Sequence, residues 1–165
     1  MQHVQTRSTT SALVLTAVLI ALATLFTMYT KIPVPGIRGY FNVGDVVIMT
    51  SALLLGRKYG AYIGAIGPAL ADLFLGYAVF VPITFVVKGI EGYLVGTVYN
   101  HKTTTSALVA TIVGGIVIVA GYFIAEYFVF DPVVAIASIL TNAIQVVMSV
   151  IVSMILYAIL RKRLG

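Results

Sequence analysis

Residues 85–96 read FVVKGIEGYLVG, a run of apolar and small residues that also carries Lys88 and Glu91. At the centre of a bilayer each of these charges would cost about 2.5 to 3.5 kcal/mol. The two residues are three positions apart, so a helix would place them on one face. Charged residues in a membrane segment normally face a bundle interior or a water-filled cavity. In a membrane protein, this stretch therefore predicts a polar pocket or a buried ion pair.

The composition of the whole chain is that of a membrane protein. Of its 165 residues, 61% are hydrophobic and 9% are charged, against about 25% charged residues in a typical soluble domain. The mean hydropathy is +1.10. Too few polar side chains are present to coat a soluble globule of this size. Since helices satisfy all their own backbone hydrogen bonds in lipid, we predict an all-α integral membrane protein.

Four polar or turn-forming stretches help to divide the chain into apolar segments. The four stretches are TKIPVPGIRGY, GRKYG, NHKTTT and FDP. A membrane span needs about 20 mostly apolar residues. The pattern predicts a six-transmembrane-helix bundle in a single domain, residues 1–165, with spans at 11–29, 41–55, 61–79, 81–99, 106–128 and 132–160. The second span is short, which fits a tilted helix buried in protein or a broken helix.

The first apolar segment follows Arg7 and has some features of a signal peptide. Its apolar run continues to residue 29, and further apolar spans follow. We interpret it as an uncleaved membrane helix, with a cleaved signal peptide as the alternative.

Basic residues gather on one side of the predicted bundle. Six spans place both termini on the side that holds Arg7, Arg57, Lys58, Lys102, Arg161, Lys162 and Arg163. The opposite side holds Lys31 and Arg38, with Glu126 and Asp131 near it. The positive-inside rule predicts that both termini are cytoplasmic in a multi-pass protein of the cell membrane. This placement also explains the net charge of +5 without a nucleic-acid partner.

Polar residues recur at helical spacing within the spans. Thr84, Lys88 and Glu91 share one face of the fourth span, and Lys88 lies about 10 Å from its outer end. The sixth span carries a polar seam made of Ser138, Asn142, Gln145 and Ser149. Other spans add Asp45, Asp72, Tyr122 and Glu126. These groups gather in the outer half of the bilayer, where they predict a pocket open to the outside.

The candidate ligand contacts come from this polar layer and from one aromatic residue beside the first external loop. They are Lys88, Asn142, Gln145, Glu91, Thr84, Tyr40, Asp72 and Tyr122. The amides offer donors and acceptors together, which suits a neutral polar ligand. Two alternatives stay open: Lys88 pairs internally with Asp72 or Asp45, and the aromatic residues belong to the interfacial belt.

The chain lacks the motifs of an enzyme. It has no cysteine, and its two histidines, His3 and His101, lie outside the predicted spans. It contains no zinc-binding signature and no P-loop, so we expect no catalytic site, metal or cofactor, and no use of ATP by the chain alone. Ala17 and Ala21 form a small-residue pair on the first span, a pattern that lets another helix approach closely.

The ordered motifs of the middle of the chain resemble a known family. The stretch GYFNVGDVVIMTSALLLGRKYGAYIGAIGPALADLFLGY, followed by VPITFVVKGIEGYLVG, resembles the substrate-binding S components of energy-coupling factor (ECF) vitamin transporters. The pair Ala17-x-x-x-Ala21 matches the Ala-x-x-x-Ala motif of that family's first helix. The chain looks most like prokaryotic members for hydroxymethylpyrimidine (a thiamin precursor) or pyridoxine. Members for folate, pantothenate and riboflavin look less similar.

The resemblance implies a mode of action. The protein would capture a vitamin or its precursor from outside and deliver it to a transmembrane coupling protein and two ATPases. The alanines of the first helix would contact the coupling protein, and the loop at residues 31–40 would act as a gate. Two other classes stay open: a stand-alone secondary transporter or proton-coupled exporter that uses Glu91 or Asp72, and a structural membrane subunit without a ligand.

Overall fold

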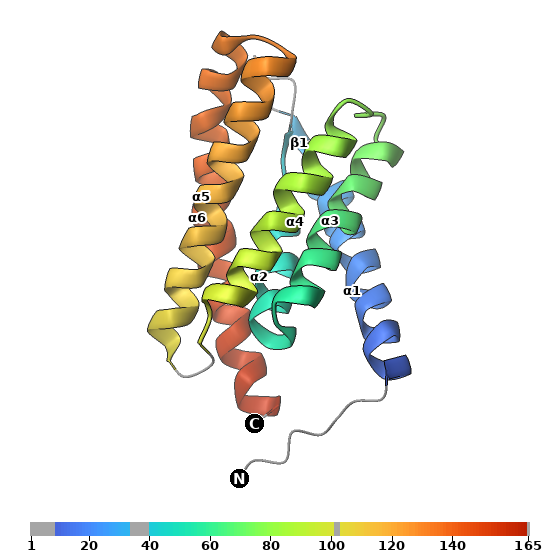
Figure 1. The fold of residues 1–165 in the computed structure, drawn as a ribbon, viewed down its shortest axis with the longest axis vertical. Coiled ribbons are helices and arrows are strands. Elements are labelled where there is room, and N and C mark those ends of the chain that lie inside the picture. Colours follow the sequence, from blue (N-terminus) through green and yellow to red (C-terminus); the bar gives the residue numbers. More distant parts are fainter. Residues whose placement is uncertain (1–8, 34–39, 101–102, 165) are drawn as a thin grey trace.

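The computed structural model of the chain describes residues 9–33, 40–100 and 103–164. Within them the helices are α1 (Thr9–Tyr29), α2 (Gly44–Leu55), α3 (Arg57–Phe74), α4 (Phe80–Val98), α5 (Thr104–Val129) and α6 (Pro132–Leu164). They form one bundle, as Figure 1 shows. The predicted six-helix, all-α architecture is confirmed. One short antiparallel pair, β1 (Ile32–Pro33) with β2 (Tyr40–Phe41), joins α1 to α2.

Four of the six helices are long and apolar enough to cross a membrane: Thr10–Tyr29, Phe80–Val98, Thr104–Val129 and Pro132–Arg163. The helix α2 has only 12 residues, and α3 carries three charged residues, Arg57, Lys58 and Asp72. That these two also cross the bilayer stays a prediction.

The boundary between α2 and α3 differs from the predicted one. We expected GRKYG to form a loop, but a single residue, Gly56, separates the helices, and α3 begins at Arg57. Gly56 has φ +88°, a left-handed conformation that glycine adopts without steric cost. This conformation interrupts the helix within one residue. The predicted bounds 61–79 are therefore wrong at both ends, since α3 ends at Phe74 and another glycine with positive φ, Gly76, follows.

The short helix α2 is enclosed by protein. Ten of its twelve residues are buried, and it contacts α1, α3, α4, α5 and α6. A helix that is not exposed to lipid need not match the thickness of the hydrocarbon layer. Of the two explanations for the short second span, the structure supports the buried neighbour. The predicted span started at residue 41, but Tyr40 and Phe41 belong to β2.

Glycines bring α3 and α4 into close contact. A Cβ atom placed on Gly92 would lie 2.1 Å from the carbonyl oxygen of Gly60, and one on Gly64 would lie 2.2 Å from that of Lys88. Only residues without a side chain allow backbones this close. The contact therefore sets the position of the α4 segment that carries Lys88.

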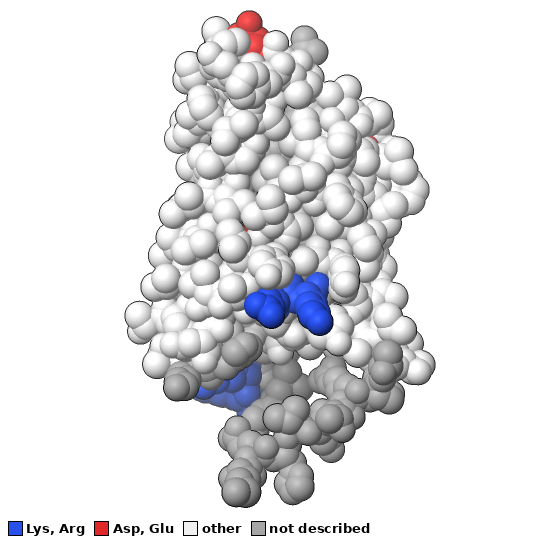
Figure 2. All heavy atoms as spheres, viewed as in Figure 1, with Lys and Arg blue, Asp and Glu red and all other residues white. Residues whose placement is uncertain are grey.

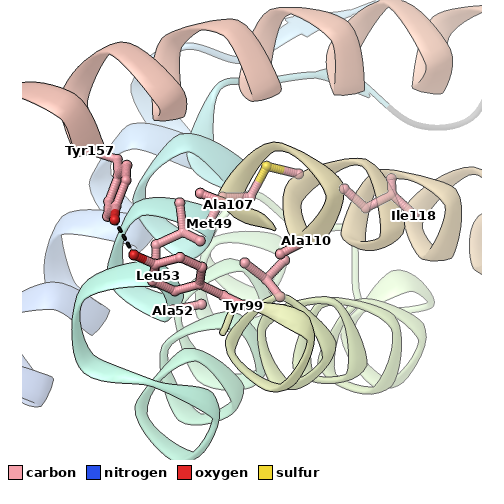
Figure 3. Packing of buried hydrophobic residues seen from close by; sticks show 9 residues of the cluster. Met49, Ala52, Leu53, Tyr99, Ala107, Ala110, Ile118 and Tyr157 are labelled. Atoms are coloured by element: carbon pink, nitrogen blue, oxygen red, sulfur yellow. Dashed lines mark hydrogen bonds between the residues drawn. The ribbon is translucent and has the colours of Figure 1, made fainter. Parts of the chain in front are cut away.

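A hydrophobic cluster fills the bundle between α2, α4, α5 and α6. Figure 3 shows Met49, Leu53, Ala110 and other apolar side chains pointing toward one another. Tyr99 and Tyr157 lie at one edge, where their hydroxyl groups share a hydrogen bond. This cluster forms the apolar core between these four helices.

The start of α1 and the end of α6 lie at the same end of the bundle (Figure 1). The exposed basic residues of the α2–α3 junction and the last turn of α6 are Arg57, Lys58, Arg161, Lys162 and Arg163. On the face drawn in Figure 2, the Lys and Arg side chains lie in the lower half and acidic atoms appear at the top. This distribution agrees with the predicted orientation. Arg7, Arg38 and Lys102 lie outside the described residues.

Candidate functional site

A polar cavity of about 40 Å³ lies between α1, the start of α2, α3, α4, α5 and α6. Six of the eight predicted contact residues line it: Asp72, Thr84, Lys88, Tyr122, Asn142 and Gln145. Its other lining residues are Thr27, Asn42, Pro68, Phe80, Glu126 and Ser138. A volume of this size holds a few water molecules, so a ring compound requires the cavity to widen.

The deepest part of the site is an ion network that we define as Lys88, Asp45, Glu91 and Gln145. The Nζ atom of Lys88 donates to Oδ1 of Asp45 and lies 3.7 Å from Oε2 of Glu91. All three charged residues are at most 2% exposed. Buried charges persist when they are paired and hydrogen-bonded. The internal pairing considered for Lys88 therefore exists, with Asp45 as the partner, and Lys88 also lines the cavity.

Gln145 uses both ends of its amide within the protein. Its Nε2 donates to Oδ2 of Asp45 at 2.7 Å, and its Oε1 accepts from the backbone N–H of Asn42 at 2.9 Å. These bonds tie α6 to the start of α2. The ion network thus joins α2, α4 and α6, and each end of the Gln145 amide makes one hydrogen bond within the protein.

Glu91 is enclosed more completely than predicted. It is fully buried and does not line the cavity. Neither of its carboxylate oxygens has a hydrogen bond within the part of the chain that the structure describes. The network therefore holds one cation against two carboxylates, so full ionisation would leave it with a net negative charge.

The α5–α6 side of the cavity is different, and we define its polar wall as Glu126, Ser138 and Asn142. The hydroxyl of Ser138 donates to Oε2 of Glu126. Asn142 is half-buried, and no hydrogen bond to its amide occurs among the described residues. The polar wall therefore offers unused donors and acceptors to whatever occupies the cavity.

Thr84 and Tyr122 complete the site between these two regions. Their hydroxyl groups are 3.0 Å apart and share a hydrogen bond across α4 and α5. The Nζ atom of Lys88 lies 5.5 Å from the centroid of the Tyr122 ring, within cation–π range. Tyr40 belongs to β2, and its side chain lies outside the part of the structure that is described.

Sequence reasoning missed four of these participants as site residues. Asp45 and Glu126 were placed in the polar layer but not among the ligand contacts, although Glu126 follows Tyr122 at the i, i+4 spacing of one helical face. Ser138 was recognised only as part of the α6 seam. Asn42 contributes through its backbone N–H, for which the sequence carries no signal.

Ala17 and Ala21 are both exposed on α1, beside the exposed Val14 and Val18. Further along α1, Thr24 is buried, and its hydroxyl donates to the carbonyl oxygen of Gly67 at 2.9 Å. The alanine pair itself faces away from the bundle.

A family model for the S component of an ECF-type riboflavin transporter matches residues 7–162. The chain is an ECF S component. This S component is 30% identical over 149 residues to the thiamine precursor transporter HmpT of Lactococcus lactis subsp. cremoris, covering 89% of this chain and 83% of that protein. It is 40% identical over 145 residues to an uncharacterized protein of Pyrococcus woesei, covering 86% and 96% of the two chains.

Solved structures agree with the fold of the S component. The S component of a bacterial ECF transporter superposes with a TM-score of 0.73 at 21% identity, covering 94% of this chain and 98% of that one. A biotin S component gives a TM-score of 0.59 at 19% identity, covering 91% and 94%. At these identities the structures establish the fold alone.

Family membership defines the class of the protein. S components are the substrate-specific subunits of vitamin transporters, so the protein is a membrane transport component and not an enzyme. The family model carries the name of riboflavin, whereas the relative from Lactococcus carries that of a thiamine precursor. The family therefore leaves the vitamin open.

Proposed function

We propose that this S component binds a small hydroxylated pyrimidine or pyridine, with the thiamine precursor hydroxymethylpyrimidine as the first candidate and pyridoxine as the second. The observation that carries the proposal is the half-buried amide of Asn142, which lines a polar cavity and has no hydrogen bond among the described residues. A single amide offers both donors and acceptors to ring nitrogens and hydroxyl groups. Glu126 and Ser138 add polar groups to the same wall.

The size of the cavity favours a one-ring ligand. Small-molecule sites usually measure about 300 to 1,000 Å³, and this cavity of about 40 Å³ must widen for any ligand. A single six-membered ring needs less widening than a vitamin with several fused rings, such as riboflavin. Tyr122 and Phe80 line the cavity and provide aromatic surfaces for the ring faces.

Ligand release into the cell would depend on partner subunits. The chain has no P-loop, so an ATP-driven release needs separate subunits, and we propose two ATPases that act through a transmembrane coupling protein. The exposed pair Ala17 and Ala21 on α1 provides a face for a helix of the coupling protein, because small residues allow close helix contact. In this arrangement the ligand enters the cavity from outside the cell.

A binding experiment tests the substrate. The purified chain in lipid nanodiscs would be titrated calorimetrically with hydroxymethylpyrimidine, pyridoxine and riboflavin. We expect saturable one-to-one binding of a one-ring compound and weaker binding of riboflavin. Tight binding of riboflavin alone would reject the proposed substrate class while leaving the family assignment intact.

A transport experiment tests the dependence on partners. Proteoliposomes would contain the chain alone or together with the coupling protein and both ATPases. We expect ATP-dependent accumulation of the bound compound only with the complete set. Accumulation against a gradient by the chain alone would instead support a stand-alone secondary transporter that uses Glu91 or Asp72.

A further inference from the structure

Glu126 occupies an unusual position in the cavity wall. It is 3% exposed and lies on α5, one turn after Tyr122 and close to the end of that helix. Its Oε2 accepts a hydrogen bond from Ser138. No lysine or arginine forms an ion pair with it among the described residues. A buried carboxylate with so few hydrogen-bond partners is costly. Among the described residues, Glu126 forms no ion pair with a member of the ion network.

Lys88 brings a cation to the same cavity, but its ammonium group is already engaged. Lys88 donates to Asp45 and lies 3.7 Å from Glu91, so it is held by the ion network. An ionised carboxylate can accept about four hydrogen bonds, and Ser138 supplies one of them. Glu126 therefore retains acceptor capacity toward the cavity, and a ligand with N–H donors is the group that would use it.

The residues beside Glu126 indicate which chemical groups this ligand carries. Ser138 and Asn142 are one turn apart on α6 and line the same cavity as Glu126. The polar wall thus combines a carboxylate acceptor with an amide that can donate and accept. A ring nitrogen beside an exocyclic amino group presents two adjacent nitrogens, and a carboxylate can bind such an edge through two parallel hydrogen bonds when the ring nitrogen is protonated.

We propose that Glu126 is the specificity-determining residue for an amino-substituted nitrogen heterocycle, whose exocyclic amino group donates to its carboxylate. This inference rests on the proposed function, and it selects between the two proposed ligands. It favours the aminopyrimidine over pyridoxine, which has no amino group.

The experiment compares two probes that differ in one group. They are 4-amino-5-hydroxymethyl-2-methylpyrimidine and the same compound with hydrogen in place of the amino group. Both would be titrated into the full-length chain in nanodiscs, as the wild type, Glu126→Gln and Asp131→Asn. The last variant removes one negative charge at an exposed position that does not line the cavity, and asparagine can still cap α6 there.

Losing a hydrogen bond to a buried charge predicts an effect of about 10- to 150-fold in the dissociation constant. The wild type should bind the amino compound more tightly than the other probe by that factor. Glu126→Gln keeps an acceptor oxygen but loses the charge, so it should bind the amino compound more weakly and show a smaller preference, and Asp131→Asn should match the wild type.

Two results would overturn the inference and leave the proposed function standing. One is equal wild-type affinity for the two probes, and the other is unchanged binding of the amino compound by Glu126→Gln. If Glu126→Gln does not fold, the comparison of the two probes on the wild type decides by itself. A folded wild type that binds neither probe would reject the pyrimidine as the substrate, and this inference with it.

Discussion

The buried ion network, through Lys88 and Gln145, and the polar wall both line the cavity, but their side chains are engaged within the protein to different degrees. In the ion network, Lys88 and Gln145 are held by Asp45 and by the backbone of Asn42. In the polar wall, Asn142 has no partner among the described residues, and Glu126 has one in Ser138. We infer that the first region holds α2, α4 and α6 together, whereas the second recognises the ligand.

The largest effect is expected from Lys88→Met. This change leaves Asp45 and Glu91 buried without a cation. Removing one partner of a buried ion pair costs about 3 to 5 kcal/mol, which corresponds to a melting temperature about 6 to 20 °C lower. Thermal unfolding of the purified protein measures it.

A second substitution separates the loss of the pair from loss of packing. The double variant Lys88→Met/Asp45→Asn removes the stranded charge at Asp45, so it should recover part of the lost stability. If Lys88→Met melts at the wild-type temperature, the ion network does not hold the helices and the comparison fails.

A smaller loss of stability is expected from Gln145→Ala. The change strands the backbone N–H of Asn42, which costs about 1 to 3 kcal/mol, while Asp45 loses one hydrogen bond and keeps the one from Lys88. Ser149→Ala is the matched control one turn further along α6, because its buried hydroxyl makes no hydrogen bond within the described residues. Equal melting temperatures for the two variants would show that the Gln145 bonds contribute nothing.

The sequence predicted which residues form the polar layer of this site better than it predicted which of them pair with each other and which face a ligand. Helical spacing placed Thr84 and Lys88 on one face, and the cost of charge in lipid required them to face inward; both line the cavity. Spacing along one helix does not reveal the partner on another. Whether Lys88 would meet Asp45 or Asp72 therefore depended on the packing of α2 against α4.

The helix boundaries were also only partly predictable from the sequence. Apolar length located the long helices α1, α4, α5 and α6 closely. It misplaced the start of α3 because Arg57 and Lys58 look like loop residues, whereas the left-handed conformation of Gly56 alone separates the two helices. The burial of α2 likewise follows from its contacts with all five other helices, and hydropathy carries no information on it.

The smallest effect on the isolated chain is expected from Ala17→Leu combined with Ala21→Leu. Both residues are exposed on α1, and substitutions at such positions usually change stability by less than about 0.5 kcal/mol. Ligand affinity and melting temperature should therefore stay at their wild-type values. Co-purification with the coupling protein should fall, since leucine keeps a partner helix away. Unchanged co-purification would place the docking face elsewhere.

Titration of Asn142→Ala with hydroxymethylpyrimidine, paired with its melting temperature, tests most directly whether the polar wall binds the ligand. Asn142 has no hydrogen-bond partner among the described residues, so its loss strands nothing in the protein. We predict an unchanged melting temperature and a dissociation constant raised about 5- to 150-fold, the range for one lost hydrogen bond to a buried group. Wild-type affinity in this variant would contradict the account.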